Sequence, residues 1–339
     1  MVYQPWIRRI VGVALLLFFE VATIAAQPHS RQFHLEYKVA VNNLPSSHHR
    51  FELWIPVPHD GPYQRIRGLR VNSPYPYEIT VAADGNTMVH LSAGQNTQRT
   101  FVVTISLDAA RMEHIEPLLF RTARMAQDDK VEQFGPYLKA DRLVPLDDQI
   151  RAWARDVALN ANARTDIEKA NAIYRHVIST VKYDKSGKGW GRGDIYYACQ
   201  ERRGNCTDFH AIFIGYARAL GIPARFAIGL SLPADRGEGK LAGYHCWAEF
   251  YAKGIGWIPV DAAEAAKNPA KRDYFFGAID ENRIQLSEGR DVILAPKQSS
   301  DPLNYFVYPC AELDGKPFAG TTYDFEYRDT VNQAEAALH

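Results

Sequence analysis

The second half of the chain contains a cysteine, a histidine and an aspartate in settings that suit nucleophilic catalysis: Cys206, His245 and Asp261. Cys206 opens a helical pattern, and the unpaired N–H groups of a helix's first turn favour a thiolate, the reactive form of cysteine. His245 lies on a strand-like run, and Asp261 ends the next one. A nucleophile, a base and a carboxylate that orients the base form a catalytic triad. The sequence therefore predicts a thiol enzyme with Cys206 as nucleophile, His245 as base and Asp261 as orienter.

The elements that must position these residues can be read from hydrophobic spacing. A helix is expected over 206–220, because six apolar residues recur along one face: Phe209, Ile212, Phe213, Tyr216, Ala217 and Leu220. Gly221 and Pro223 are typical helix stops. Strands are expected at 224–232, 244–251 and 257–261, and a turn at 253–256 makes the last two antiparallel neighbours. This pattern predicts an α+β domain in which a helix packs on an antiparallel sheet.

Two further helices precede this region. Apolar residues repeat at helical spacing over 150–158, and Thr165 and Glu168 form a capping box that opens a helix reaching Val181. The glycine-rich stretch 186–193 follows no strand and lacks a Gly-Lys-Ser/Thr ending, so it is predicted to be a flexible loop rather than a phosphate loop.

The N-terminal half has the pattern of a β-sandwich. Strand-like segments occur at 33–41, 51–57, 77–81, 88–91 and 101–107, separated by clusters of turn residues. Pro56 and Pro58 suggest that the second of these segments is an edge strand. The expected organisation is a signal peptide at 1–26, a sandwich domain at 27–135, a catalytic domain at 136–300, and a C-terminal strand and tail at 301–339.

Composition and the N-terminus limit the function and its compartment. The chain has 339 residues with 39 basic and 39 acidic side chains, so nucleic acid is not an expected partner. Residues 1–26 have the layout of a secretory signal: Arg8 and Arg9, an apolar run over 10–19, and small residues up to Ala26. That run is shorter than a membrane span, although 10–26 could remain as an uncleaved anchor. The mature protein is predicted to be periplasmic or secreted, with no integral span.

The four cysteines allow two other interpretations. If Cys206 is a free thiol, at most one disulfide can form among Cys199, Cys246 and Cys310, and its pairing cannot be read from the sequence. Cys206, His210, His245 and Cys246 also offer the ligand types of a zinc site. Successive strand residues face opposite ways, however, so His245 and Cys246 are not expected to share one ion. No metal or cofactor is predicted, and Cys246 is expected in the core.

Four motifs carry a family resemblance: 203–208 (RGNCTD), 220–225 (LGIPAR), 244–249 (YHCWAE) and 256–261 (GWIPVD). With the order Cys206, His245, Asp261, they make roughly residues 150–295 similar to the transglutaminase-like family, whose core resembles papain-type thiol enzymes. The resemblance implies a transglutaminase-like domain after the sandwich and assigns the same three catalytic roles. It also implies an oxyanion site made by the N–H of Cys206 and an upstream side chain, for which Trp190 is the candidate.

What the resemblance implies for function is acyl transfer through a cysteine thioester, on amide or peptide bonds of a peptide or protein substrate. Hydrolysis, as by a protease or deamidase, is favoured over cross-linking because the chain is predicted to be exported and has no Asp-rich calcium loop. The alternative is a non-catalytic extracytoplasmic binding or assembly module on the same fold.

Overall fold

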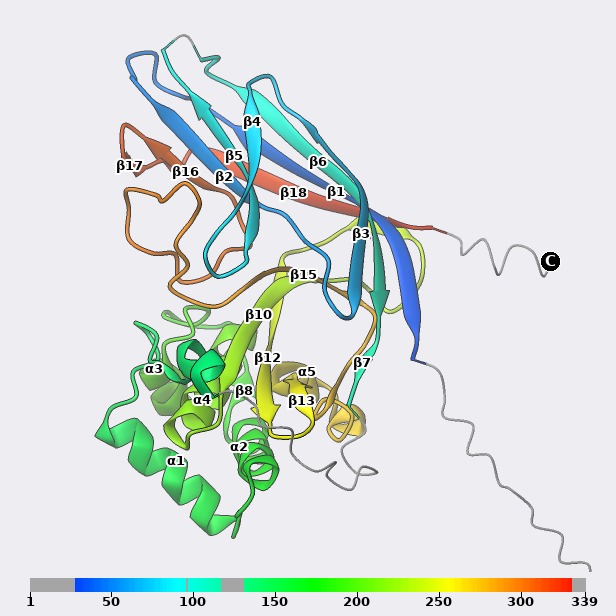
Figure 1. Cartoon of the computed structure of the whole chain (residues 1–339), viewed down its shortest axis with the longest axis vertical. Coiled ribbons are helices and arrows are strands. Elements are labelled where there is room, and N and C mark those ends of the chain that lie inside the picture. Colours follow the sequence, from blue (N-terminus) through cyan, green and yellow to red (C-terminus); the bar gives the residue numbers. More distant parts are fainter. Residues whose placement is uncertain (1–27, 96, 117–130, 331–339) are drawn as a thin grey trace, which may run out of the picture.

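The computed structural model describes residues 28–95, 97–116 and 131–330, which form a β-sandwich and a mixed helix and sheet domain (Figure 1). The expected signal peptide lies outside these residues. Within the described part of the chain, no helix is long and apolar enough to cross a membrane. The observed class is α+β, as the sequence predicts.

The sandwich consists of two five-stranded sheets whose neighbouring strands are antiparallel. The first has the order β11-β18-β1-β6-β3: Glu238–Lys240, Thr321–Asp329, Ser30–Val41, Phe101–Met112 and Gln64–Asn72. The second has the order β17-β16-β2-β5-β4: Lys316–Pro317, Cys310–Leu313, Phe51–Pro56, Thr87–Ala93 and Tyr77–Val81. Along β1 every second side chain is buried, the alternation expected of a strand with one face on a core.

The C-terminal strands decide the layout of both sheets. β16 pairs with β2 in one sheet, and β18 pairs with β1 in the other. Residues after 309 therefore complete both sheets that the N-terminal half begins. The prediction that Pro56 lies on an edge strand is therefore wrong, since β2 lies between β16 and β5. Pro56 is tolerated because it ends β2, two residues beyond Trp54, where the pairing with β16 stops.

The second domain places helices on a four-stranded antiparallel sheet. The helices are α1 Asp148–Asn160, α2 Asp166–Thr180, α3 Ile195–Glu201, α4 Cys206–Ala219 and α5 Ala262–Lys267, with 3₁₀ turns at Val131–Leu138 and Pro269–Lys271. The sheet order is β13-β12-β10-β15: Gly256–Val260, Tyr244–Ala252, Ala224–Ser231 and Arg283–Glu288. A short parallel pair joins β8 Lys182–Tyr183 to β9 Arg203–Gly204. The helices at 150–158 and 165–181 and the 244–261 hairpin are confirmed, whereas α3, β3 and β15 were not predicted.

Helix α4 is the central element of this domain. Residues Cys206 to Arg218 are all buried, and α1, α2, α3 and β12 contact it. The helix ends where the sequence predicts, because Gly221 adopts a positive φ of 80° just after the Leu220 cap. Burial on all sides makes the N-terminus of α4 a rigid position for Cys206.

Strand pairing also joins the two domains. β11 lies between β10 and β12 in the sequence but pairs with β18 of the sandwich. Conversely, β7 (His114–Ile115) of the N-terminal half pairs with β14 (Ala278–Ile279) of the second domain. Each domain thus contributes a strand to the other, and the border between them is called the seam below.

Candidate active site

Capping interactions define the start of α4. Asn205 is the N-cap: its side chain accepts from Thr207 N at 3.0 Å, and Asp208 Oδ2 accepts from Asn205 N at 2.9 Å. Asn205 Nδ2 also donates to the Tyr244 hydroxyl at 2.8 Å, which ties the helix to the first residue of β12. The Cys206 side chain, beside this cap, is only 2% exposed.

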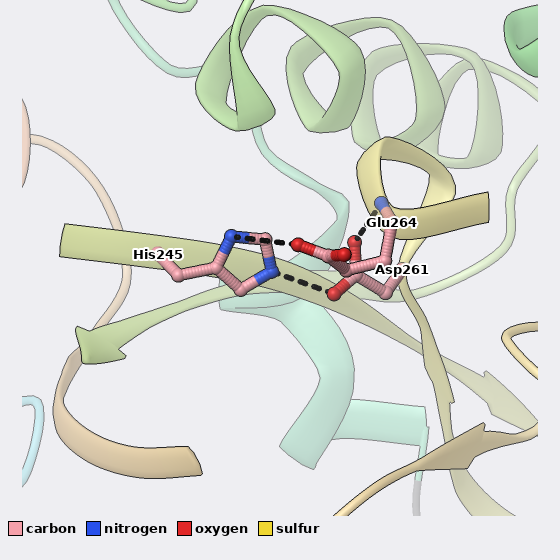
Figure 2. A group of neighbouring side chains, drawn as sticks. All are labelled: His245, Asp261 and Glu264. Carbon is pink, nitrogen blue, oxygen red and sulfur yellow. Dashed lines mark hydrogen bonds and ion pairs between the residues drawn. The ribbon is translucent and has the colours of Figure 1, made fainter. Parts of the chain in front are cut away.

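The histidine and the carboxylate lie on the adjacent sheet. His245 Nε2 is 2.6 Å from Asp261 Oδ2, and both side chains are buried. Asp261 follows β13 as the N-cap of α5, where its Oδ1 accepts from Glu264 N at 2.9 Å. Figure 2 shows the imidazole of His245 directed at this carboxylate, with the Glu264 carboxylate 3.9 Å from the other ring nitrogen, Nδ1. Both oxygens of Asp261 are thus engaged, and the carboxylate cannot swing away from the ring.

The thiol completes the arrangement. The Cys206 thiol interacts with His245 and with Cys246, the next residue of β12, since both groups lower its pKa. Because Nε2 of His245 binds Asp261, the nitrogen that faces the thiol is Nδ1. The structure therefore brings the three predicted residues, Cys206, His245 and Asp261, together in one site.

Three comparisons with known proteins bear on the family and the fold of this chain. Residues 151–262, from α1 to α5, match the model of the transglutaminase-like superfamily. These residues form a transglutaminase-like domain. An uncharacterized protein of Haemophilus influenzae is 27% identical over 337 residues, covering 85% of this chain and 87% of that protein.

One solved structure shares the fold over most of the chain. A candidate cysteine protease from Cytophaga hutchinsonii superposes with a TM-score of 0.59 at 18% identity, over 90% of this chain and 93% of that one. The periplasmic domain of TgpA from Pseudomonas aeruginosa gives a TM-score of 0.35 at 13% identity, over 71% of this chain and 90% of that one. The first match indicates a shared fold that includes the sandwich, and the second is too distant to support any inference.

Electrostatics in the transglutaminase-like domain favour an ion pair. Burial disfavours the charged imidazole, but the charge and hydrogen bond of Asp261 raise the pKa of His245 to about 9. Burial also opposes ionisation of Cys206, yet hydrogen bonds from Cys246 and His245 and the charge of His245 hold its pKa well below the ordinary value. Cysteine and histidine are thus poised as thiolate and imidazolium, the reactive form of a thiol nucleophile.

Cys246 assists this ionisation. It is fully buried, as the sequence predicts, and burial together with the neighbouring Cys206 charge raises its pKa well above the ordinary value. Its thiol therefore keeps a proton that it can donate to the Cys206 thiolate. All four cysteines of the chain are free, so the structure contains none of the disulfides that the sequence allowed.

His210 has a structural role. Its Nε2 accepts the N–H of Ala262 at 3.2 Å, and its Nδ1 lies 3.6 Å from Cys246 Sγ. Burial lowers the pKa of His210, in agreement with a neutral ring. Because the Nε2 lone pair is already used, His210 is poorly placed as a zinc ligand. Among the described residues, one group could share a metal ion: His245, Asp261 and Glu264. The short hydrogen bond between His245 and Asp261 leaves no space for an ion between those two side chains.

Trp190 lies on the glycine-rich loop, which the side chain of Asp208 holds. Gly191 N and Gly193 N donate to the Asp208 carboxylate at 2.7 and 3.0 Å. The backbone directly after the half-buried Trp190 is thus held at the first turn of α4. Its role at the oxyanion stays a prediction, since the position of a substrate carbonyl decides it.

Sequence reasoning missed two residues that support the triad. Asp208 carries a readable signal, because an N-cap Asn205 followed three residues later by an acid is a capping box. Arg283 carries none. Its Nη2 lies 3.5 Å from Asp261 Oδ2, but it reaches the site from β15, which only tertiary folding brings close.

Proposed function

We propose that this chain is a thiol enzyme that hydrolyses amide or peptide bonds through a Cys206 thioester. The observation that carries the proposal is the grouping of Cys206 with His245 and Asp261, with a 2.6 Å bond between the ring and the carboxylate. The family match supports the class of chemistry.

In the proposed first step, the Cys206 thiolate attacks the carbonyl carbon, and the carbonyl π electrons move to oxygen. The backbone N–H of Cys206 and the indole N–H of Trp190 stabilise that oxyanion. The C–N bond then breaks, and the proton on His245 Nδ1 passes to the leaving nitrogen, which departs as ammonia or an amine. Asp261 keeps the ring oriented and favours its charged form throughout.

In the second step, neutral His245 takes a proton from water, and the resulting hydroxide attacks the thioester. The C–S bond breaks, a carboxylic acid is released, and Cys206 returns as a thiolate beside the imidazolium. We favour water over a protein amine as acceptor because Cys206 is only 2% exposed, and water reaches such a site most easily. The signal-like N-terminus supports export, which places the substrate outside the cytoplasm.

The test incubates glutamine-containing peptides with the enzyme and a fluorescent primary amine, followed by mass spectrometry. Deamidated or cleaved peptide is expected from the unmodified chain and from Cys310→Ala, which removes a free cysteine of the sandwich, but not from Cys206→Ala. Incorporated amine would indicate cross-linking instead. Equal turnover by Cys206→Ala would refute the nucleophile, and peptide binding without turnover would indicate a binding module.

A second variant tests the oxyanion role. Trp190→Phe keeps the aromatic ring and removes the N–H, so kcat is expected to fall about 100-fold with KM little changed. An unchanged kcat would remove Trp190 from the mechanism.

A further inference from the structure

A cavity of about 440 Å³ lies at the seam, away from Cys206. Arg225 and Glu249 line it from β10 and β12, and Arg111 and His114 line it from the sandwich side. On β12, Glu249 alternates with Phe250, which packs toward α4, so the cavity is on the opposite face of the sheet. Its volume is in the range of small-molecule sites.

Unpartnered polar atoms gather in this cavity. Within the described residues, five buried side-chain nitrogens lack a hydrogen-bond partner, and three of them belong to its lining: His59 Nδ1, Arg111 Nε and His114 Nε2. The side chains of Arg111 and His114 are more than nine-tenths buried. Buried polar groups in folded proteins nearly always have partners, so these atoms indicate a missing one.

The geometry around His114 defines where that partner binds. The ring stacks on Tyr63 with centroids 3.7 Å apart. Its Nε2 lies 4.0 Å from Glu116 Oε1, too far for a direct hydrogen bond but suited to one donor atom that bridges both. Burial lowers the pKa of His114 to about 4, and its other nitrogen, Nδ1, faces the Glu249 carboxylate, with Oε1 4.0 Å away. The neutral ring thus offers Nε2 as an acceptor.

The charge of the lining favours a cation. Two guanidinium groups, Arg111 and Arg225, face four carboxyl groups: Asp60, Glu116, Glu249 and Glu288. Arg225 is already committed, because it binds Glu249 at 2.5 Å and Glu288 at 3.1 Å. Burial raises the pKa of Glu288 to about 7, and Arg67 lies 3.6 Å from Asp60. Glu116 is therefore the lining carboxylate that no guanidinium or ammonium group pairs with in the described part of the chain.

We propose that the seam cavity binds a small primary amine that also carries an oxygen acceptor, as amino alcohols do. The ammonium group donates to His114 Nε2 and to the Glu116 carboxylate. The oxygen accepts from Arg111 Nε. One ligand then supplies partners for two of the three unpartnered nitrogens, those of Arg111 and His114. Glu116, which already accepts from the Tyr63 hydroxyl at 3.2 Å, adds its negative charge.

Calorimetric titration of the full chain with ethanolamine tests this proposal. Saturable binding is expected in the unmodified chain and in the control His34→Phe, which removes a partly exposed histidine paired with Asp108. His114→Phe keeps an aromatic ring on Tyr63 but loses Nε2, and Glu116→Gln removes the charge. Both are expected to bind about tenfold more weakly or worse, since each loses a hydrogen bond to a charged group.

Two further ligands separate charge from hydrogen bonding. Tetramethylammonium has the positive charge without N–H donors, and acetate has oxygen acceptors and a negative charge without N–H donors, so neither is expected to compete with ethanolamine. No saturable heat with ethanolamine, equal binding of acetate, or unchanged affinity in both variants would overturn the proposal. Cys206→Ala is expected to bind ethanolamine normally, so failure of the catalytic proposal would not affect this one.

Discussion

Replacing Asp261 by asparagine is expected to leave Cys206 without the charged histidine that stabilises its thiolate. In the native protein the carboxylate raises the pKa of His245 to about 9 against the opposing effect of burial. Asparagine removes the charge, burial then dominates, and the ring becomes neutral at pH 7. Cys206 loses its counter-charge, and its pKa returns to about 8.5 or higher. At pH 6 the thiolate fraction then falls to about 0.3%, a loss of roughly 300-fold.

The assay is the rate of iodoacetamide alkylation, followed by intact mass between about pH 5 and 10. The native thiolate is lost only on acidification below its depressed pKa, so native alkylation should already be fast at pH 6. The rate of Asp261→Asn should rise steadily with pH and approach the native rate near pH 10. Burial raises the pKa of Cys199 and Cys310, so neither thiol should contribute at pH 6.

The fold is expected to survive this change, because asparagine is as good an N-cap for α5 as aspartate. Asp273→Asn is the matched control, since its carboxylate is exposed and pairs with Arg175 away from the site. If Asp261→Asn melts normally and keeps the native pH profile, Asp261 does not sustain the ion pair, and the electrostatic reasoning is wrong.

Two further substitutions test the support around the site. Arg283→Met should lower the free energy of unfolding in urea by about 3–5 kcal/mol, because it removes a buried cation next to Asp261. In the same variant, kcat should fall more than KM changes. An unchanged free energy of unfolding would show that this contact does not stabilise the protein. Gly229→Ala should cost about 3 kcal/mol or more, because its Cβ would lie 1.8 Å from the Ile284 carbonyl oxygen and push β10 from β15. Gly61→Ala, with no atom within 4 Å of its Cβ, is the control and should change stability by less than about 0.5 kcal/mol.

Local patterns in the sequence were sufficient for the elements that hold the triad. The apolar repeat predicted α4 to within one residue at its C-terminus, since burial along one side of a helix imposes a 3.6-residue period. The turn at 253–256 placed β12 beside β13, so the approach of His245 to Asp261 follows from neighbouring segments. The expected domain boundaries and signal peptide stay predictions.

Only the tertiary structure decided which distant segments meet. Nothing within residues 321–329 indicates that they pair with residues 30–41, because strand pairing is set by packing of the whole sheet and not by either strand alone. The same holds for Arg283, which reaches Asp261 from β15, and for the seam cavity, whose lining comes from both domains. The sequence thus supplied the candidate catalytic residues and predicted their local elements, since such elements depend on short-range periodicity. Folding determined the surroundings that set their charge, since burial and Coulomb interactions depend on distances in space.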